Sequence, residues 1–290
     1  AGLGDSLRHT ILSHRDSLKP LIRRATVQTN ETARGLAWIL PLAHVGWPAV
    51  HLIELGASAG LNLTAERRSY QLKDDSQPPR HLLTLGTGTP PQFVTTCRGE
   101  AAGLDHLPCC PEILSRTGLD LAPFYLQSAA DELNLSSFVW GDQASRLERL
   151  REGIAAVRSV AATSAPVRLV AARLPEELPA FLAAHSASVA GAPVVVYNTT
   201  MAMYLPDEGQ SLGGMLDRWA KTRPEPVMWV QWEMFQDDEN APGYGHHAWT
   251  VDLWHRGRHR RWHLAWVHPH GTNLEWNSQV EDFFKISIQI

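Results

Sequence analysis

The sequence has few cysteines and no large excess of either charge. Only 3 of its 290 residues are cysteine. Cys109 and Cys110 are adjacent and Cys97 stands alone, which excludes a disulfide framework and a Cys-x-x-Cys zinc or redox motif. The chain has 26 Lys and Arg against 30 Asp and Glu. Such a balance does not concentrate a phosphate backbone, so we expect no nucleic-acid partner and interpret the short basic run 255–261 as a solvated hairpin tip.

Long uninterrupted hydrophobic runs are also absent. The most apolar stretch, 36–61, is broken by Pro41, His44, Pro48, His51 and Glu54. These interruptions exclude a membrane span, so we expect no membrane partner. The first residues lack a basic-then-apolar signal pattern, and three cysteines suit a reducing compartment. We therefore expect a soluble, cytoplasmic protein, whose oligomeric state the sequence leaves unknown.

The chain does contain enough apolar material for a full core, at 44% of its residues. Residues 1–46 are predicted to form a helical cap, with Thr29, Asn30 and Glu31 offering N-cap groups. Residues 47–290 are predicted to form one domain, in which a Pro-rich insertion at about 70–112 carries strand-like runs at 81–85 and 92–96 that we interpret as a hairpin.

Strands and helices alternate along the rest of this domain. Strands are predicted at 49–55, 118–121, 167–172, 194–197 and 227–232. Helices are predicted from Leu61, after a cap at Asp142, from Pro175 and around 212–219. Residues 249–254 and 262–267 flank a Gly257 turn and predict an antiparallel hairpin. The alternation predicts an α/β fold with a doubly wound, mostly parallel sheet and an antiparallel C-terminal edge.

One segment carries most of the functional information. The strand at 49–55 ends in Gly56-Ala57-Ser58-Ala59-Gly60, ahead of the predicted helix. Gly56 allows a tight turn, and the small residues leave the backbone bare enough for a ligand to lie against it. The helix would direct its free N–H groups at a carboxylate or phosphate. Glu54 could accept hydrogen bonds from an ammonium group, which suits a cofactor that carries an amino acid.

The same five residues also satisfy the G-x-S-x-G nucleophile elbow of serine hydrolases, with Ser58 as the nucleophile. Asp252 and His268 would then complete the order Ser, Asp, His. An elbow normally follows several strands and an oxyanion loop, whereas everything before Ala49 is predicted to be helical. We therefore rank the hydrolase second, beside a glycine-rich turn that binds nothing.

Five segments, spread over nearly the whole chain, match a known family. They are 28–31 with Arg34, 54–63, 118–121, 140–143 with Arg146 and Leu147, and 194–200. Residues 51–63 resemble motif I of class I S-adenosylmethionine-dependent methyltransferases, and the whole chain resembles the bacterial domain-of-unknown-function family 2332 of that superfamily. The resemblance implies a Rossmann-like methyltransferase fold, S-adenosylmethionine as the cofactor and an unidentified small molecule as the substrate. A non-catalytic S-adenosylmethionine-binding protein is a further alternative.

The resemblance also implies where the cofactor binds. Asp120 would hold the ribose hydroxyls if the Pro-rich segment is an insertion between the first helix and the second strand. The third strand, 168–173, lacks the usual acid near the adenine, for which Asp142 and Gln143 are candidate substitutes. The predicted cofactor-binding residues are Glu54, Gly56, Ala57, Ser58, Gly60, Asn62, Asp120, Asp142, Gln143, Asn198 and Thr199.

Methyl transfer is an in-line displacement for which the cofactor supplies the activation, so the protein mainly aligns the reactants and excludes water. A general base is needed only if the acceptor is protonated. The candidates are Glu31, from the N-terminal helices, and Glu233, at the predicted end of the fifth strand. Two histidine pairs, at 246–247 and 268–270, show no third partner in register, so we expect no metal.

Overall fold

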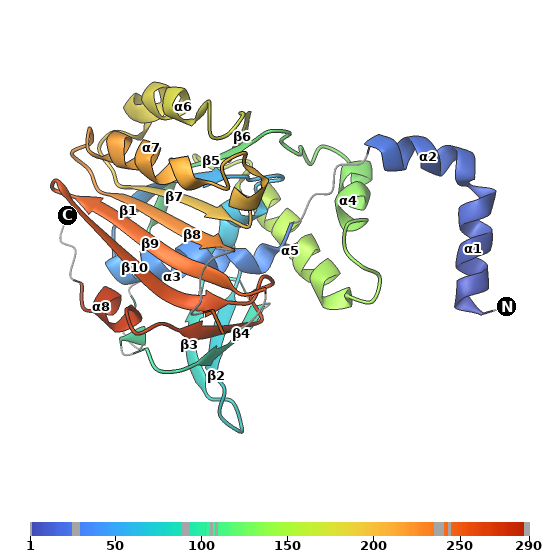
Figure 1. The fold of residues 1–290 in the computed structure, drawn as a ribbon, viewed down its shortest axis with the longest axis horizontal. Helices are drawn as coiled ribbons and strands as arrows, with labels where there is room; N and C mark the ends of the chain where they lie inside the picture. The colour runs from blue at the N-terminus through green and yellow to red at the C-terminus, as the bar shows by residue number, and fades with distance from the viewer. Residues whose placement is uncertain are drawn as a thin grey trace.

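One large sheet forms the centre of the protein, and helices lie on both of its faces (Figure 1). In this computed structural model, the described residues are 2–24, 30–88, 93–101, 103–104, 107, 110–234, 241–242 and 245–286. Within them, 11 strands are ordered β3-β2-β4-β11-β10-β9-β8-β7-β1-β5-β6. The fold is therefore mixed α/β.

The strands predicted to be parallel are parallel, and they form one end of the sheet, with β6 at its edge. They are β1 (Ala49–Leu55), β5 (Glu112–Asp120), β6 (Val167–Ala171), β7 (Val194–Thr199) and β8 (Val227–Glu233). Strands β5 and β6 extend the sheet on one side of β1, and β7 and β8 extend it on the other. The strand order thus reverses between β1 and β7, and all five strands end at the same edge, where doubly wound sheets bind ligands.

The predicted C-terminal hairpin is confirmed. Strands β9 (His247–His255) and β10 (Arg258–Val267) pair antiparallel, and β9 also pairs antiparallel with β8. The basic run lies at the hairpin tip, where most of its residues are exposed. A short strand that the sequence did not predict, β11 (Asn273–Trp276), joins β10 to β4.

The Pro-rich segment adds three strands to the far end of this sheet. They are β2 (Tyr70–Asp74), β3 (His81–Leu85) and β4 (Phe93–Arg98). The two strand-like runs predicted here do form β3 and β4, but the prediction that they pair with each other is wrong. Strand β3 pairs antiparallel with β2, while β4 lies on the other side of β2 and parallel to it. Pairing with β11, about 180 residues further along the chain, keeps β4 away from β3.

Helical segments cover both faces of the parallel strands. One face packs against η1 (Thr32–Gly35), α3 (Leu36–Val45) and part of η2 (Leu61–Arg67). The other face packs against α6 (Leu178–His185) and α7 (Gln210–Ala220). Further helical segments are α4 (Ala129–Ser136), α5 (Ala144–Val160), η4 (Ser186–Val189), η5 (Ala202–Tyr204) and α8 (Val280–Phe284). None of the helices in the described ranges is long and apolar enough to cross a bilayer.

The helical segment predicted from Leu61 begins there, as a 3-10 helix that is broken at Thr64, where the backbone angles are not helical. Two other helix predictions need correction. Helix α5 is capped at Gln143, one residue after the predicted Asp142, and no side chain bonds to the cap. Helix α6 begins at Leu178, because a turn follows Pro175.

The N-terminal helices divide into an exposed pair and a buried one. Helices α1 (Leu3–Ser13) and α2 (Arg15–Arg24) stand away from the sheet in Figure 1, and α1 has no buried residue. Helix α3, in contrast, is almost wholly buried, and Trp38 is completely inaccessible. Glu31, one of the three predicted N-cap residues, caps η1 by accepting a hydrogen bond from the Ala33 nitrogen, and Thr29 lies outside the described residues. The domain boundary at residue 46 stays a prediction.

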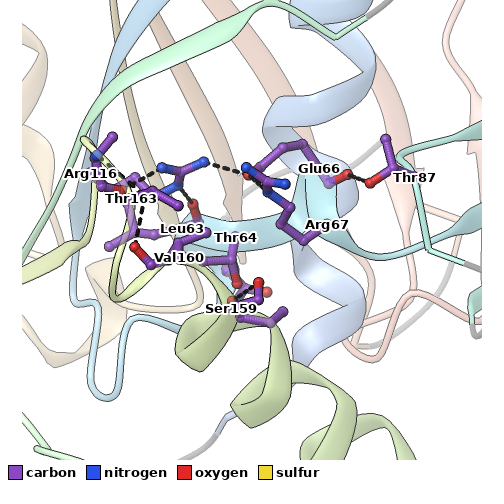
Figure 2. A network of polar contacts seen from close by, with 12 residues as sticks. Leu63, Thr64, Glu66, Arg67, Thr87, Arg116, Ser159, Val160 and Thr163 are labelled. Carbon is purple, nitrogen blue, oxygen red and sulfur yellow. Dashed lines mark hydrogen bonds and ion pairs between the residues drawn. The ribbon is translucent and has the colours of Figure 1, made fainter.

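A buried ion pair fixes η2 beneath the sheet (Figure 2). Arg116 of β5 donates from Nη2 to Glu66 of η2, and from Nε to the carbonyl oxygen of Leu63 at 3.0 Å. A third nitrogen, Nη1, donates to the carbonyl oxygen of Ala165. Because chain oxygens occupy all three groups of this guanidinium, the network is structural and holds the segment that follows the glycine loop.

Candidate functional site

Polar residues gather where the parallel strands end. Glu54 is the penultimate residue of β1, Asp120 ends β5, and Glu233 ends β8. Asn198 and Thr199 are the last two residues of β7. In the strand pairing, Leu55 is opposite both Leu119 and Asn198, so these side chains lie at one edge of the sheet. Most of the residues predicted to bind a cofactor therefore come together at the position where strand order reverses.

The loop 56–60 is held to the end of β5. The nitrogens of Gly56 and Ala57 both donate to the carbonyl oxygen of Leu119, at 2.8 and 3.0 Å. Asp120 Oδ2 accepts a hydrogen bond from the Ser58 nitrogen at 2.8 Å, and its Oδ1 accepts one from the Ala122 nitrogen at 2.9 Å. The acid predicted from the resemblance thus touches the glycine loop, although 62 residues separate Asp120 from Ser58.

Two residues at this edge adopt a left-handed backbone that is unusual for residues other than glycine. Ser58 has a φ of 48° and Thr200 a φ of 54°. The strain is greater for Thr200, because its side chain branches at Cβ. Ser58 Oγ accepts a hydrogen bond from Asn30 Nδ2 at 3.3 Å, and Thr200 Oγ1 lies 3.2 Å from His247 Nδ1. Strained residues cluster at ligand sites, so this placement marks the edge as a candidate site.

Gly56 is required by its surroundings as well as by its backbone. Its φ is +76°, and a Cβ placed on it would lie 2.3 Å from Met201 Cγ. Met201 follows β7, and its side chain packs against Gly56 at the point where the strand order reverses. The space beside the bare backbone at position 56 is therefore filled by a methionine side chain in this structure. The sequence predicted a ligand in that space.

Glu54 is buried opposite Tyr197 of β7. Burial raises the pKa of Glu54 to about 8, against smaller lowering by the Tyr197 hydroxyl and Arg68. Among the described residues, neither Glu54 Oε2 nor the Tyr197 hydroxyl has a partner with hydrogen-bond geometry. Glu54 is therefore mostly protonated at pH 7, and its carboxyl and the Tyr197 hydroxyl face each other inside the site.

Glu233 and Asn198 form a saturated network. Glu233 accepts hydrogen bonds from the Met201 nitrogen at 3.0 Å, the Ala202 nitrogen at 3.2 Å and Asn198 Nδ2 at 2.7 Å. Asn198 Oδ1 in turn accepts from Trp229 Nε1 at 2.7 Å. Burial raises the pKa of Glu233, and the three hydrogen bonds oppose that rise. These contacts position the loop that carries Met201, and the role of Glu233 as a general base stays a prediction.

Glu31, the other predicted base, is surrounded by cations. Arg146 Nε lies 3.0 Å from Glu31 Oε2, Arg149 Nη2 lies 3.6 Å from Oε1, and His270 Nδ1 lies 3.1 Å from Oε2. Burial acts to raise the pKa of Glu31, but His270, the two arginines and the Ala33 nitrogen outweigh it and hold the pKa below its usual value. Glu31 is therefore ionised at neutral pH, which favours electrostatic pairing.

The remaining predicted residues lie at the margins of this cluster. Asn62 Nδ2 donates to the Glu31 carbonyl oxygen at 3.3 Å. Gln143 Oε1 accepts from Arg146 Nη1 at 2.6 Å, which links it to Glu31. Asp142 is exposed in the turn before α5 and makes no hydrogen bond or ion pair with the described part of the chain. The cofactor roles of all three stay predictions.

Sequence reasoning missed Met201 and Arg149. It named His270 only in a histidine pair, and Arg34 and Arg146 only as parts of matching segments. Arg34 is buried and donates from Nε to the Pro269 carbonyl oxygen at 3.0 Å, across 235 residues of sequence. No local pattern signals such a contact. The repeated arginines of α5 are the one signal in the sequence that could have pointed to this cluster.

Of the residues named for a hydrolase, Asp252 lies apart from Ser58. Asp252 contacts His259 Nε2 at 2.8 Å and is opposite Trp229 in the β8–β9 pairing, away from the edge that carries Ser58. The ring of His268 lies against that of His270, with ring centroids 5.5 Å apart. Within the described residues, no group of three or more His, Cys, Asp or Glu side chains is placed to hold a metal ion.

The fold and this cluster define an α/β protein with a polar site at the carboxyl edge of a parallel sheet. The family profile described as an uncharacterized protein conserved in bacteria (DUF2332) matches residues 1–276. The chain therefore belongs to that bacterial family. No curated protein and no solved structure matches it.

Proposed function

We propose that this protein binds S-adenosylmethionine at the carboxyl edge of the sheet and transfers its methyl group to a small molecule. The observation that carries the proposal is the hydrogen bond between Asp120 and the Ser58 nitrogen. It brings an acid at the end of the second parallel strand to the glycine loop after the first, which is how dinucleotide-type folds arrange a ribose-binding acid. The strand order β6-β5-β1-β7-β8 supports a Rossmann-like fold of this kind.

The residues at this edge fit the chemical groups of the cofactor. Asp120 is partly accessible, and each carboxylate oxygen retains acceptor capacity for ribose hydroxyls beside its one backbone hydrogen bond. Glu54, which faces the Tyr197 hydroxyl, would offer its carboxylate to an ammonium group, and that contact would favour the ionised form of this raised-pKa carboxyl. Met201 would have to move from Gly56, and an unbranched methionine side chain repacks readily.

The bound cofactor supplies an activated methyl group on a positively charged sulfur, so the chain has few chemical tasks. The loop 56–60 and Asp120 would orient the cofactor, and the loop after β7 would cover it and exclude water. Glu31 and Glu233 are the two acids available to take a proton from a hydroxyl or ammonium acceptor. Glu233 would act only if its hydrogen bonds with Met201 and Ala202 rearranged.

Calorimetric titration with S-adenosylmethionine and S-adenosylhomocysteine tests the proposal. We expect both to bind to the natural chain and neither to bind to Gly56→Val. Gly191→Val is the matched control, because Gly191 has a φ of +81° and nothing within 4 Å of its Cβ position. Absence of binding to the natural chain overturns the proposal. Binding without methyl transfer to any tested acceptor supports a non-catalytic cofactor-binding protein instead.

A serine hydrolase is the second candidate, and the φ of 48° at Ser58 is the observation that favours it. A nucleophile elbow holds its serine on a strained turn of this type. Labelling with a fluorophosphonate separates the two functions. Covalent labelling that disappears in Ser58→Ala supports the hydrolase, whereas a methyltransferase of the proposed kind remains unlabelled.

A further inference from the structure

Positively charged side chains gather beside the proposed cofactor loop, and the proposed function does not use them. We call Arg34, Arg146 and Arg149 the arginine cluster. Arg146 and Arg149 touch Glu31 directly, at 3.0 and 3.6 Å, and Arg34 lies within electrostatic range of the same carboxylate. Three guanidinium groups thus share one carboxylate between them, which leaves an excess of positive charge.

Several donors of this cluster have no acceptor. Arg34 is only 5% exposed, and its one hydrogen bond to the described residues runs from Nε to the Pro269 carbonyl oxygen. Its two terminal nitrogens donate to no atom in the described ranges. Arg149 Nε is also buried without a partner there. A guanidinium has five donors, and leaving them unpaired inside a protein is costly, so an acceptor from outside the chain would find them available.

The other acids nearby compensate the cluster only in part. Glu233 attracts Arg34 electrostatically, but its carboxylate oxygens accept hydrogen bonds from the Met201 and Ala202 nitrogens and from Asn198. Glu54 is mostly protonated at pH 7, because burial raises its pKa to about 8. The local potential is positive enough to act on a neighbour: burial first, and then Arg34, lowers the pKa of His247 to about 4.

We propose that the arginine cluster binds a carboxylate or phosphate group of the methyl acceptor, with Arg34 as the main contact. This inference rests on the proposed function and names the class of its substrate. The sulfonium of the cofactor is itself a cation, so uncompensated arginines beside it would repel it. An anionic acceptor placed between the two neutralises both charges. The planar fork of a guanidinium also matches the paired oxygens of a carboxylate or phosphate.

The test uses inorganic phosphate and acetate as probes, titrated calorimetrically into the full chain at constant ionic strength set with chloride. We expect saturable binding of at least one probe to the natural chain, and the tighter one identifies the anionic group. In Arg34→Gln the affinity should fall about tenfold or more, as expected when a charge-assisted hydrogen bond is lost. Arg158→Gln is the matched control, because Arg158 is an exposed arginine of α5 that pairs with Glu132.

The natural chain and each variant are also titrated with S-adenosylhomocysteine, and their folding is checked by circular dichroism. If Arg34→Gln fails to fold, Arg146→Gln takes its place, because Arg146 is 14% exposed at its side chain. S-adenosylhomocysteine binding without any anion binding, or equal anion binding by a folded Arg34→Gln, overturns this inference and leaves the proposed function in place. Anion binding without S-adenosylhomocysteine binding overturns the proposed function and retains the anion site.

Discussion

Asp120 Oδ2 accepts the backbone N–H of Ser58 at 2.8 Å, so the end of β5 determines the shape of the loop after β1. The other oxygen, Oδ1, accepts from the Ala122 nitrogen at 2.9 Å. One carboxylate therefore connects two loops at the edge where the strand order reverses. A residue in this position affects both the stability of the fold and the binding of any ligand at the loop, and the two effects can be measured separately.

Asp120→Asn should weaken both properties. It removes the charge that strengthens two hydrogen bonds, so we expect a loss of about 1–3 kcal/mol in the free energy of unfolding. Affinity for S-adenosylhomocysteine should fall about tenfold or more, because a charge-assisted bond to the ribose would also be lost. Asp142→Asn is the control, since Asp142 is exposed and contacts none of the described residues. Unchanged affinity in Asp120→Asn would show that Asp120 does not bind the ribose. Lost affinity in Asp142→Asn would show that the turn before α5 takes part in binding.

Local patterns in the sequence predicted much of the sheet, whereas contacts between distant segments decided the rest. The continuous apolar runs of β7 and β8 and the Gly257 turn are local signals, and each gave a correct strand or hairpin. The pairing of β4 with β11 depends on residues about 180 positions apart, which no local pattern encodes. The same limit applies to the site. Asp120 was found through a resemblance, but the meeting of Glu31 with Arg146 and His270 depends on how α5 and the β10–β11 connection fold back.

The buried carboxyl of Glu54 should make stability depend on pH. Burial raises its pKa in the folded protein to about 8, so the folded state keeps a proton that the unfolded state loses above about pH 4.5. The free energy of unfolding should therefore fall as the pH rises from 6.5 to 8, by up to about 1.4 kcal/mol per pH unit from this group. His247, whose pKa is lowered from 6.5 to about 4, acts in the opposite direction, mainly between pH 4 and 6.5, and its effect fades as the pH rises through this window. Urea denaturation at several pH values measures the slope.

Glu54→Gln should abolish that slope, because glutamine has a similar shape and does not titrate. Glu112→Gln is the matched control, since Glu112 is an exposed glutamate at the start of β5. A slope that persists unchanged in Glu54→Gln would show that another group holds the proton.

Gly56 and Gly191 separate the cost of a strained backbone from the cost of a collision. Both have a positive φ, but a Cβ at Gly56 would meet Met201 Cγ at 2.3 Å, whereas nothing lies within 4 Å of a Cβ at Gly191. Gly191→Ala should cost about 1–2 kcal/mol in the free energy of unfolding. Gly56→Ala should cost a further 1–3 kcal/mol, roughly, because it overpacks the loop. Adding Met201→Ala to Gly56→Ala should recover part of that extra cost, and equal losses at the two glycines would contradict the packing of Met201 against Gly56.

Arg67 and Arg116 both contact Oε1 of Glu66, but they should differ greatly in what they contribute to stability (Figure 2). The Arg116 side chain is 3% exposed and that of Arg67 is 48% exposed. Arg116→Ala should cost about 3–5 kcal/mol, because it leaves the Glu66 carboxylate buried without its main partner. Arg67→Ala should cost no more than about 1 kcal/mol, since water screens an exposed pair. Chemical denaturation of the two variants measures both costs. Similar values would mean that Glu66 is reached by water and that the network does not anchor η2.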